Sequence, residues 1–346
     1  MKFSKILTHW YSNNKRNLPW RETVNPYYIW LSEIILQQTQ VKQGLPYYEA
    51  FVSKFPSVFD LAKAQESDVL KLWQGLGYYS RARNLHASAK YVANELGGEF
   101  PDNYKDLLKL KGVGDYTASA IASICFNEVA AVVDGNVYRV LSRYFGIDTP
   151  INSSKGAKEF KTLAQELIDV KQPAEFNQAI MEFGATHCKP KNPDCNNCPF
   201  IDSCIAFNKN KIPELPVKIK SAKAKKKYFN FLVFISEDER TIIEKREGKG
   251  IWQNLYQFPL IETDKNPIEK GFKSLVKNHE FLKNMAFEMS LYNKESIIHK
   301  LSHQHLYTKF WVINVKSLPV EGVSFNKIRE FAVPILVGNF IESFNF

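Results

Sequence analysis

The sequence lacks any uninterrupted apolar run approaching the ~20 residues that a membrane-spanning helix requires. Its first residues, MKFSKILTHWYSNNKR, also lack the long apolar stretch and the small-residue cleavage site of a secretory signal. Cysteine is scarce, with five residues, and without a sign of export we do not expect these to form disulfides. We therefore expect a soluble protein of the cytoplasm.

Acidic residues are fewer than basic ones. The chain has 46 lysines and arginines against 36 aspartates and glutamates, a formal charge of +10. This excess favours an anionic partner, with nucleic acid as the first candidate. The 346 residues are enough for two domains, and 45% hydrophobic and 14% aromatic content argue against disorder.

Four of the five cysteines lie within 17 residues, in the pattern C-x6-C-x2-C-x5-C. Thiolates this close in sequence can converge on one metal centre. A [4Fe–4S] cluster is the favoured interpretation. Structural zinc, disulfides and four unrelated buried cysteines are the alternatives, because spacing alone does not select iron over zinc. The four residues are Cys188, Cys195, Cys198 and Cys204.

Periodicity divides the chain into a helical part, residues 1–207, and an α+β part, residues 228–346. The lysine- and proline-containing segment 208–227 between them predicts an extended, solvated linker, or alternatively a basic strap along a phosphate backbone. Strands are expected at 229–235, 241–246 and 306–315. Helices are expected at 27–40, 69–73, 80–96, 104–110, 116–125, 137–144, 158–170 and 176–183.

Two glycine turns share one form and each precedes an expected helix. They are GLGYYS at 75–80 and GVGDYT at 112–117. In the second, Gly112 and Gly114 permit a tight helical hairpin whose free N–H groups can bind a phosphate, although a plain hairpin is the alternative. Asp134 precedes another expected helix, where it can act as a cap.

Together these features resemble the helix-hairpin-helix DNA glycosylase superfamily that includes endonuclease III, and within it the adenine DNA glycosylase (MutY-type) family. The resemblance covers nearly all of residues 1–207 and implies an N-terminal glycosylase domain with a [4Fe–4S] cluster held by the four cysteines, within residues 186–206. It rests on LPWR (18–21), WLSEIILQQTQV (30–41), LWQGLGYYSRARNL (72–85), GVGDYT, VVDGNVYRV (132–140), FNQAIMEFGATHC (176–188) and the cysteine pattern.

The resemblance implies a catalytic pair, Glu33 and Asp134. The apolar residues that follow Glu33 would desolvate it and raise its pKa, so that it could protonate adenine N7. An exposed helical glutamate is the alternative. Asp134 would stay ionised and stabilise the oxocarbenium-like sugar. Tyr116 stands where bifunctional relatives have a Schiff-base lysine, so hydrolysis without strand cleavage is expected, with Lys109 and Lys111 as possible sources of weak lyase activity.

Further residues are implied to bind DNA or the extruded base. Gln38 and Tyr78 would act as wedges, and Gln178 would hydrogen-bond the adenine. For Tyr78 and the tryptophans, packing in the core is the alternative. The remaining positions, which line the base pocket or contact phosphates, are Trp20, Arg21, Trp30, Gly112, Gly114, Lys189 and Lys191.

The C-terminal part resembles a Nudix-like lesion-recognition domain through WQNLYQFP (252–259) and LSHQHL (301–306). Ser302 and His303 fall on the loop that probes the lesion, where Leu301 replaces an aromatic residue. A buried, backbone-bonded His303 is the alternative. The acidic signature of active Nudix enzymes is missing, so nucleotide hydrolysis is not expected.

The sequence thus predicts a monofunctional, monomeric, nucleoid-associated glycosylase. Its expected partner is double-stranded DNA with adenine opposite 8-oxoguanine or guanine. Two other functions stay open: a bifunctional glycosylase/lyase and a non-catalytic iron–sulfur DNA-binding protein.

Overall fold

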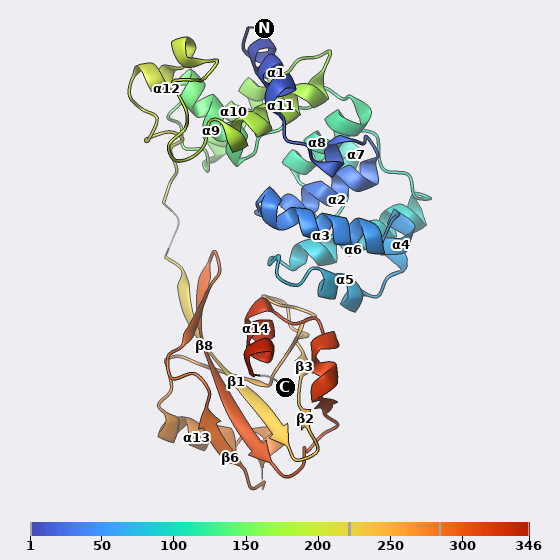
Figure 1. Cartoon of the computed structure of the whole chain (residues 1–346), viewed down its shortest axis with the longest axis vertical. Coiled ribbons are helices and arrows are strands. Elements are labelled where there is room, and N and C mark those ends of the chain that lie inside the picture. Colours follow the sequence, from blue (N-terminus) through green and yellow to red (C-terminus); the bar gives the residue numbers. More distant parts are fainter. Residues whose placement is uncertain (1, 221–222, 284, 345) are drawn as a thin grey trace. The chain divides into compact units, whose positions relative to one another are not determined.

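The computed structural model describes residues 2–220, 223–283, 285–344 and 346. They form two compact units (Figure 1). The first unit contains residues up to 63 together with 84–220, and the second contains 64–83 together with the residues from 223 onward. No described helix is long and apolar enough to cross a membrane.

The first unit is helical, as predicted. Its helices are α1 (Lys2–Asn14), α2 (Pro26–Leu36), α3 (Val41–Lys54), α4 (Val58–Lys63), α6 (Ser80–Glu95, which begins in the second unit), α7 (Tyr104–Leu107), α8 (Asp115–Phe126), α9 (Gly135–Phe145), α10 (Ser154–Leu167), α11 (Pro173–Thr186) and α12 (Ile205–Asn208), with 3-10 turns η1 (Pro19–Arg21) and η2 (Ile201–Ser203).

Two differences from the predicted helices matter for the site. The helix expected at 27–40 ends at Leu36, because Gln37 leaves the helical conformation with ψ of 120° and Gln38 takes a left-handed conformation with φ of 56°. Residues 37–40 are polar but include no glycine or proline that would mark this break. In addition, α1 and α3 were not predicted, although α1 supplies part of the unit's core.

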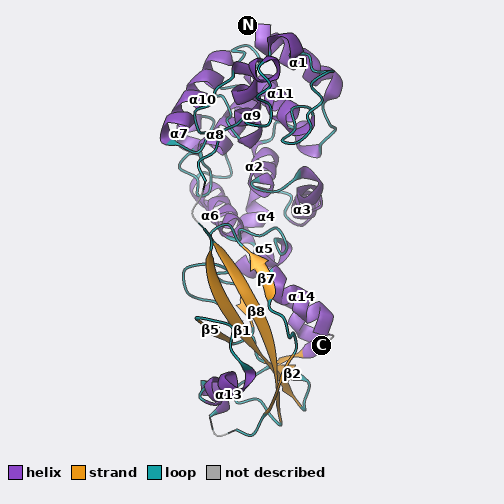
Figure 2. Ribbon diagram, turned by 90° about the vertical axis from the view of Figure 1, so that its left-hand side faces the viewer, coloured by secondary structure: helices purple, strands orange, loops and turns teal. Residues whose placement is uncertain are grey.

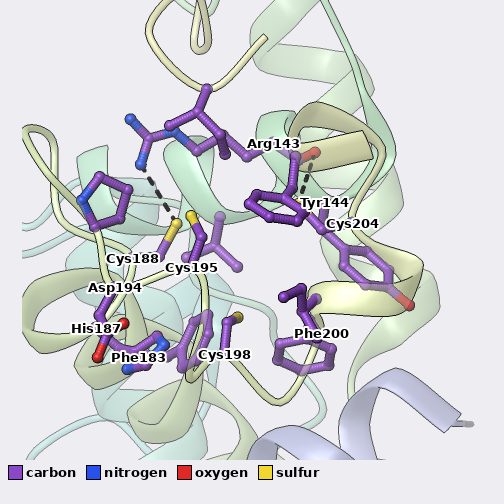
Figure 3. Close-up of a pocket in the computed structure, with 15 residues that line it drawn as sticks. Arg143, Tyr144, Phe183, His187, Cys188, Asp194, Cys195, Cys198, Phe200 and Cys204 are labelled. Atoms are coloured by element: carbon purple, nitrogen blue, oxygen red, sulfur yellow. Dashed lines mark hydrogen bonds between the residues drawn. The ribbon is translucent and has the colours of Figure 1, made fainter. Parts of the chain in front are cut away.

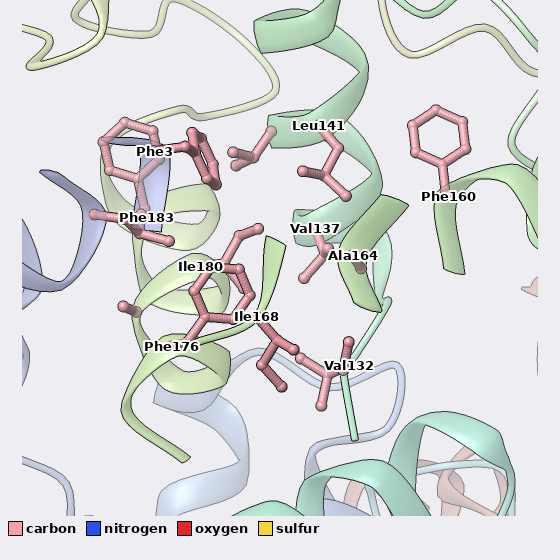
Figure 4. Close-up of a cluster of buried hydrophobic side chains, with 14 of the residues drawn as sticks. Phe3, Val132, Val137, Leu141, Phe160, Ala164, Ile168, Phe176, Ile180 and Phe183 are labelled. Atoms are coloured by element: carbon pink, nitrogen blue, oxygen red, sulfur yellow. The ribbon is translucent and has the colours of Figure 1, made fainter. Parts of the chain in front are cut away.

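The core of the first unit lies between α1, α9, α10 and α11 (Figure 4). Val137, Val140 and Leu141 project from the apolar face of α9 onto Phe176, Ile180 and Phe183 of α11. Asp134 caps the start of α9, and Gly146 ends it in the left-handed region with φ of 66°. These two caps define the ends of α9, and Asp134 is therefore held at the start of a well-packed helix.

The second unit is built on a five-stranded sheet in which β1 (Lys225–Ser236) pairs in parallel with β8 (Gln304–Val315) (Figure 2). The antiparallel strands are β5 (Leu260–Thr263), which pairs with β1, and β6 (Glu288–Leu291) and β7 (Ile297–Lys300), which pair with β8. Two short ribbons join β2 (Arg240–Thr241) to β9 (Val323–Ser324) and β3 (Glu244–Lys245) to β4 (Tyr256–Gln257).

Helices cover both faces of this sheet. Phe272 of α13 (Glu269–Lys277) stacks on Trp311, with ring centroids 4.5 Å apart. On the other face, Phe340 of α14 (Ile335–Phe344) stacks on Phe310 at 4.0 Å. Strands buried on both sides read as continuous apolar runs, which is why β1 and β8 were predicted. The single strand expected at 241–246 is instead divided between β2 and β3, which belong to two different ribbons. The remaining turns are η3 (Glu280–Leu282) and η4 (Phe325–Glu330).

Residues 64–83, which include α5 (Glu66–Leu72), group with the second unit, and nothing in the sequence indicated this. Lys71 Nζ donates to the carbonyl of Phe331 at 3.1 Å, and Asn254 Nδ2 donates to Glu66 at 2.6 Å. The segment predicted as a solvated linker, residues 208–227, also makes contacts within the fold. Asn152 and Ile219 exchange two hydrogen bonds, and residues 225–227 belong to β1.

Candidate active site

Glu33 lies near the C-terminal end of α2, beside Tyr116 of α8 and Asp134. Burial raises the pKa of Glu33 to about 7, and the nearby Asp134 carboxyl adds to this effect. A hydrogen bond from Tyr116 and the positive charge of Arg21 oppose it. A carboxyl group with this pKa is half protonated near neutral pH and can therefore act as a proton donor. The buried position of Glu33 is consistent with the prediction that desolvation raises the pKa of this carboxyl group.

Tyr116 lies in the first turn of α8, immediately after the glycine turn. Its hydroxyl hydrogen-bonds Glu33 and also lies 3.0 Å from Met181 Sδ. Burial raises the pKa of Tyr116 well above its usual value, with the two carboxyl groups adding to the shift. The hydroxyl therefore keeps its proton, and Tyr116 is a hydrogen-bond donor rather than a nucleophile.

Asp134 accepts three hydrogen bonds at the start of α9. Oδ1 accepts from the backbone N–H groups of Asn136 at 2.9 Å and Val137 at 2.8 Å. Oδ2 accepts from Asn136 Nδ2 at 2.8 Å. Burial raises the pKa of Asp134, while these bonds and the charge of Arg139 act to lower it. The site thus pairs two carboxyl groups, of which Asp134 has the donors that stabilise a charged form.

Arg139 extends this network to the first cysteine of the cluster motif. Its Nη2 donates to Asn136 Oδ1 at 2.9 Å, and its Nε donates to the carbonyl of Cys188 at 2.7 Å. A continuous series of hydrogen bonds therefore joins Asp134 to the backbone at the end of α11. Asn136 and Arg139 were not among the predicted site residues, although VVDGNVYRV contains both.

A buried charge cluster lies behind Glu33. The Glu182 carboxylate accepts from the backbone N–H and the side chain of Arg16 and from Arg21 Nη2, the side-chain bonds all being 2.7 Å. Burial alone would raise the pKa of Glu182, but these hydrogen bonds outweigh it and lower the pKa to about 2. Arg21 is thereby held close to Glu33. Arg21 was among the predicted site residues, whereas Glu182 and Arg16 were not.

Replacing Glu182 with glutamine is expected to lower the free energy of unfolding by about 3 kcal/mol, because it leaves two arginines without their buried counter-charge. Chemical denaturation at pH 7 measures this. Since the folded pKa is depressed, the Glu182 contribution is present above the unfolded carboxyl pKa near 4.5 and is lost as pH falls toward 2. Glu342→Gln, which breaks an exposed pair with Arg329, serves as the control and should change little. Equal effects of the two substitutions would contradict this account.

The glycine hairpin has the geometry that its motif predicts. Gly112 has φ of 82°, and an added Cβ would lie 2.9 Å from Asn84 Cβ, so a larger residue is excluded there. Gly114 is extended and is the N-cap of α8. Gln37 Nε2 donates to Thr117 Oγ1 at 3.3 Å, which ties the end of α2 to this hairpin. Both glycines are exposed, as a phosphate contact requires.

The predicted wedge residues share an unusual backbone. Gln38 has φ of 56° and Tyr78 has φ of 47°, both in the left-handed region that L residues rarely adopt. Both side chains are exposed, Tyr78 to 53%, so its alternative as a core residue is wrong. The Arg81 guanidinium lies 5.6 Å from the Tyr78 ring centroid, within the second unit. Exposed side chains on a strained backbone are typical of functional positions.

The two tryptophans instead lie in the core. Trp30 is fully buried and packs against Phe100, with ring centroids 5.3 Å apart. Trp20 packs edge-on against Tyr48 at 5.1 Å. Both tryptophans therefore pack in the core, which was the alternative to a place in the wall of the base pocket. Any role that they have in such a pocket is indirect.

Four further predicted contact residues are exposed, whereas Gln178 of α11 is half-buried. Lys189 and Lys191 lie on the loop after Cys188, and Ser302 and His303 lie in the turn between β7 and β8. The alternative of a buried His303 is therefore wrong. These four residues are accessible to a large ligand.

The four cysteines of the motif face one pocket (Figure 3). All are free thiols, so the disulfide alternative is wrong. The pocket is largely apolar, with Phe183, Phe200 and Tyr144 in its wall. Arg143 Nη1 lies 3.5 Å from Cys188 Sγ, and the N–H groups of Phe200 and Phe207 hydrogen-bond the sulfurs of Cys198 and Cys204. Such N–H donors and apolar walls suit thiolates that bind an iron–sulfur cluster.

The chain is similar to known proteins over most of its length. Residues 31–169 match the model of the HhH-GPD superfamily of base excision DNA repair proteins, and residues 230–343 match the NUDIX domain. A solved thermostable thymine-DNA glycosylase is 33% identical, with a TM-score of 0.56 over 60% of this chain and 95% of that one. The fold and site thus define a helix-hairpin-helix glycosylase with a C-terminal Nudix-like domain.

Two curated relatives narrow the class. The adenine DNA glycosylase of Buchnera aphidicola subsp. Schizaphis graminum is 37% identical over 308 residues, 88% of this chain and 85% of that protein. The rat adenine DNA glycosylase is 46% identical over 216 residues, 60% of this chain and 42% of that protein. The chain belongs to the adenine DNA glycosylase family, and it is an enzyme.

Proposed function

We propose that this enzyme removes adenine opposite 8-oxoguanine or guanine in double-stranded DNA by hydrolysis and leaves an abasic site. The observation that carries the proposal is the pairing of Glu33, with its raised pKa, and the hydrogen-bonded Asp134 around Tyr116. Two carboxyl groups in different environments can divide the roles of acid and charge stabiliser.

In the proposed reaction, Glu33 donates its proton to N7 of the extruded adenine, which makes the base a better leaving group. As the bond to the base breaks, positive charge develops on the sugar, and the Asp134 carboxylate stabilises it. Water then completes the hydrolysis. Tyr116 hydrogen-bonds Glu33 and orients it. Because no lysine occupies the Tyr116 position, no Schiff base forms there, and the bifunctional alternative is disfavoured.

DNA binding in this proposal uses several separate surfaces. The exposed Gly112–Gly114 turn and the cluster loop with Lys189 and Lys191 contact phosphates. Gln38 and Tyr78 enter the base stack, and Ser302 and His303 probe the base opposite adenine. The excess of basic residues supports an anionic partner. The enzyme acts as a monomer at the nucleoid.

We propose that Cys188, Cys195, Cys198 and Cys204 hold a [4Fe–4S] cluster. Each thiolate of such a cluster binds a different iron, so its ligands must face a common space. The proposal is supported by the presence of all four cysteines in the lining of one pocket. When bound, the cluster supplies order to the loop that carries Lys189 and Lys191. It takes no part in the glycosidic chemistry, which the carboxyl groups perform.

Replacing Cys198 with alanine is expected to remove most of the iron and acid-labile sulfide from the purified protein. Elemental analysis per chain measures both. Cys125→Ala is the matched control, because Cys125 lies on α8 and does not line the pocket. It should keep the wild-type content. Stoichiometric zinc without sulfide in the wild-type protein would contradict the cluster and support the zinc alternative.

The test of the proposed function uses duplexes with one adenine opposite 8-oxoguanine, guanine, thymine or cytosine. Free adenine is expected from the first two, with the strand cut only after alkali. Equal release opposite thymine would contradict the mispair specificity, and strand cleavage before alkali would favour the bifunctional alternative. Tight duplex binding with no base release would favour the non-catalytic one.

A further inference from the structure

Tyr11 of α1 contacts two side chains that the sequence predicts to bind the extruded base or line its pocket, Gln178 and Arg21. Its hydroxyl donates a hydrogen bond to Gln178 Oε1 at 2.7 Å. Its ring lies 5.5 Å from the Arg21 guanidinium carbon. Tyr11 is only 4% exposed, and neither its helix nor its position was among the predicted site features.

The hydrogen bond to Gln178 determines which end of the amide is available to a ligand. A side-chain amide has an accepting oxygen and a donating NH2 group at opposite ends. Burial raises the pKa of Tyr11 above its usual value, so the hydroxyl keeps its proton and acts as the donor. Oε1 is therefore directed to Tyr11. Among the described residues, none accepts a hydrogen bond from Gln178 Nε2.

We propose that Tyr11 is a positioning residue for base specificity, because its hydroxyl fixes the Gln178 amide with the NH2 group directed at the extruded base. This inference rests on the proposed function and on the predicted role of Gln178 as a hydrogen-bond partner of the extruded adenine. An NH2 donor favours a purine in which N1, N3 and N7 are all acceptors, as in adenine. It disfavours hypoxanthine, which has an N–H at N1.

The physical basis is a mismatch of donors. When an NH2 group faces N1–H, two buried donors are left without acceptors, and sites with such unpaired groups reject the analogue strongly. Without the Tyr11 hydroxyl, the amide can turn over and present its oxygen to N1–H. The loss of this constraint should therefore slow adenine release and improve the relative rate on hypoxanthine.

The test is Tyr11→Phe in the full-length protein, which removes the hydroxyl and keeps the ring beside Arg21. Single-turnover base release is measured from duplexes with adenine or hypoxanthine opposite 8-oxoguanine. We expect the adenine-to-hypoxanthine rate ratio to fall about tenfold. Tyr27→Phe is the matched control, because it removes another buried hydroxyl, which donates to the Phe55 carbonyl at 2.6 Å. It should leave the ratio unchanged.

A double substitution separates positioning from a structural effect. In a Gln178→Ala background, Tyr11→Phe should cause no further change in the ratio, because the group it orients is gone. An unchanged ratio in the single variant, or the same fall in both backgrounds, would overturn the inference. If the wild-type protein releases no adenine at all, the proposed function fails instead.

Discussion

Glu33→Gln is expected to slow single-turnover adenine release by about 10³-fold, within the range that general acid catalysis contributes. Glutamine keeps the size of the side chain and its hydrogen bond to Tyr116, but it has no proton to transfer to N7. Binding to the same duplex should be close to that of the wild-type protein, since the substitution leaves the exposed contact residues in place.

The pH dependence follows from the same residue. With a pKa of about 7, Glu33 is protonated and active below neutrality. The wild-type rate constant should therefore fall about tenfold per pH unit above 7. It should also fall in acid, because Asp134 must be ionised. The Glu33→Gln variant should lack the fall on the alkaline side.

Stability provides a check that the variant is folded. Because the pKa of Glu33 is raised in the folded state, the native protein binds more protons than the unfolded chain between about 4.5 and 7, and stability falls as pH rises through this window. At pH 8 the variant should therefore be at least as stable as the wild type. Glu49→Gln, at an exposed position of α3, is the activity control. A Glu33→Gln enzyme with wild-type turnover would contradict the acid role.

Asp134→Asn is expected to lower the rate by about 10³-fold, which is the upper range for removing one preorganised electrostatic group. Asparagine is as good an N-cap as aspartate, so the start of α9 should stay intact. What is lost is the negative charge opposite the developing charge on the sugar. Thermal unfolding should therefore change little while base release nearly stops.

The matched control is Asp169→Asn, since Asp169 also accepts a backbone N–H, that of Lys171 at 2.9 Å, but lies outside the site. It should retain full activity. A second distinction is the pH profile. Asp134→Asn should lose the fall in rate on the acidic side, whereas Glu33→Gln loses the alkaline one. Loss of both limbs in either variant would show that the two carboxyl groups titrate as one unit.

The residues that carry the chemistry could be predicted because they stand in short local motifs. Glu33, Tyr116 and Asp134 each lie at the start or end of a helix whose apolar pattern is visible in the sequence. The convergence of the four cysteines on one pocket follows from their short spacing. Such features depend on neighbours within a few residues, which a sequence displays directly.

Other parts depend on contacts that the sequence does not display. Glu182 meets Arg16 across 166 positions, and Tyr11 meets Gln178 across 167, so no local pattern marks either pair. The end of α2 at Leu36 was missed because the polar residues 37–40 include no glycine or proline to mark the backbone break at Gln38. The grouping of residues 64–83 with the second unit likewise rests on long-range hydrogen bonds such as that from Lys71 to Phe331.

The most direct test of the account is product analysis of the wild-type enzyme on a duplex with one adenine opposite 8-oxoguanine. Free adenine should appear in step with abasic sites, the strand should break only after alkali, and borohydride should trap no covalent complex. Intact adenine after prolonged incubation, or strand cleavage that precedes alkali and is trapped through a lysine, would contradict it.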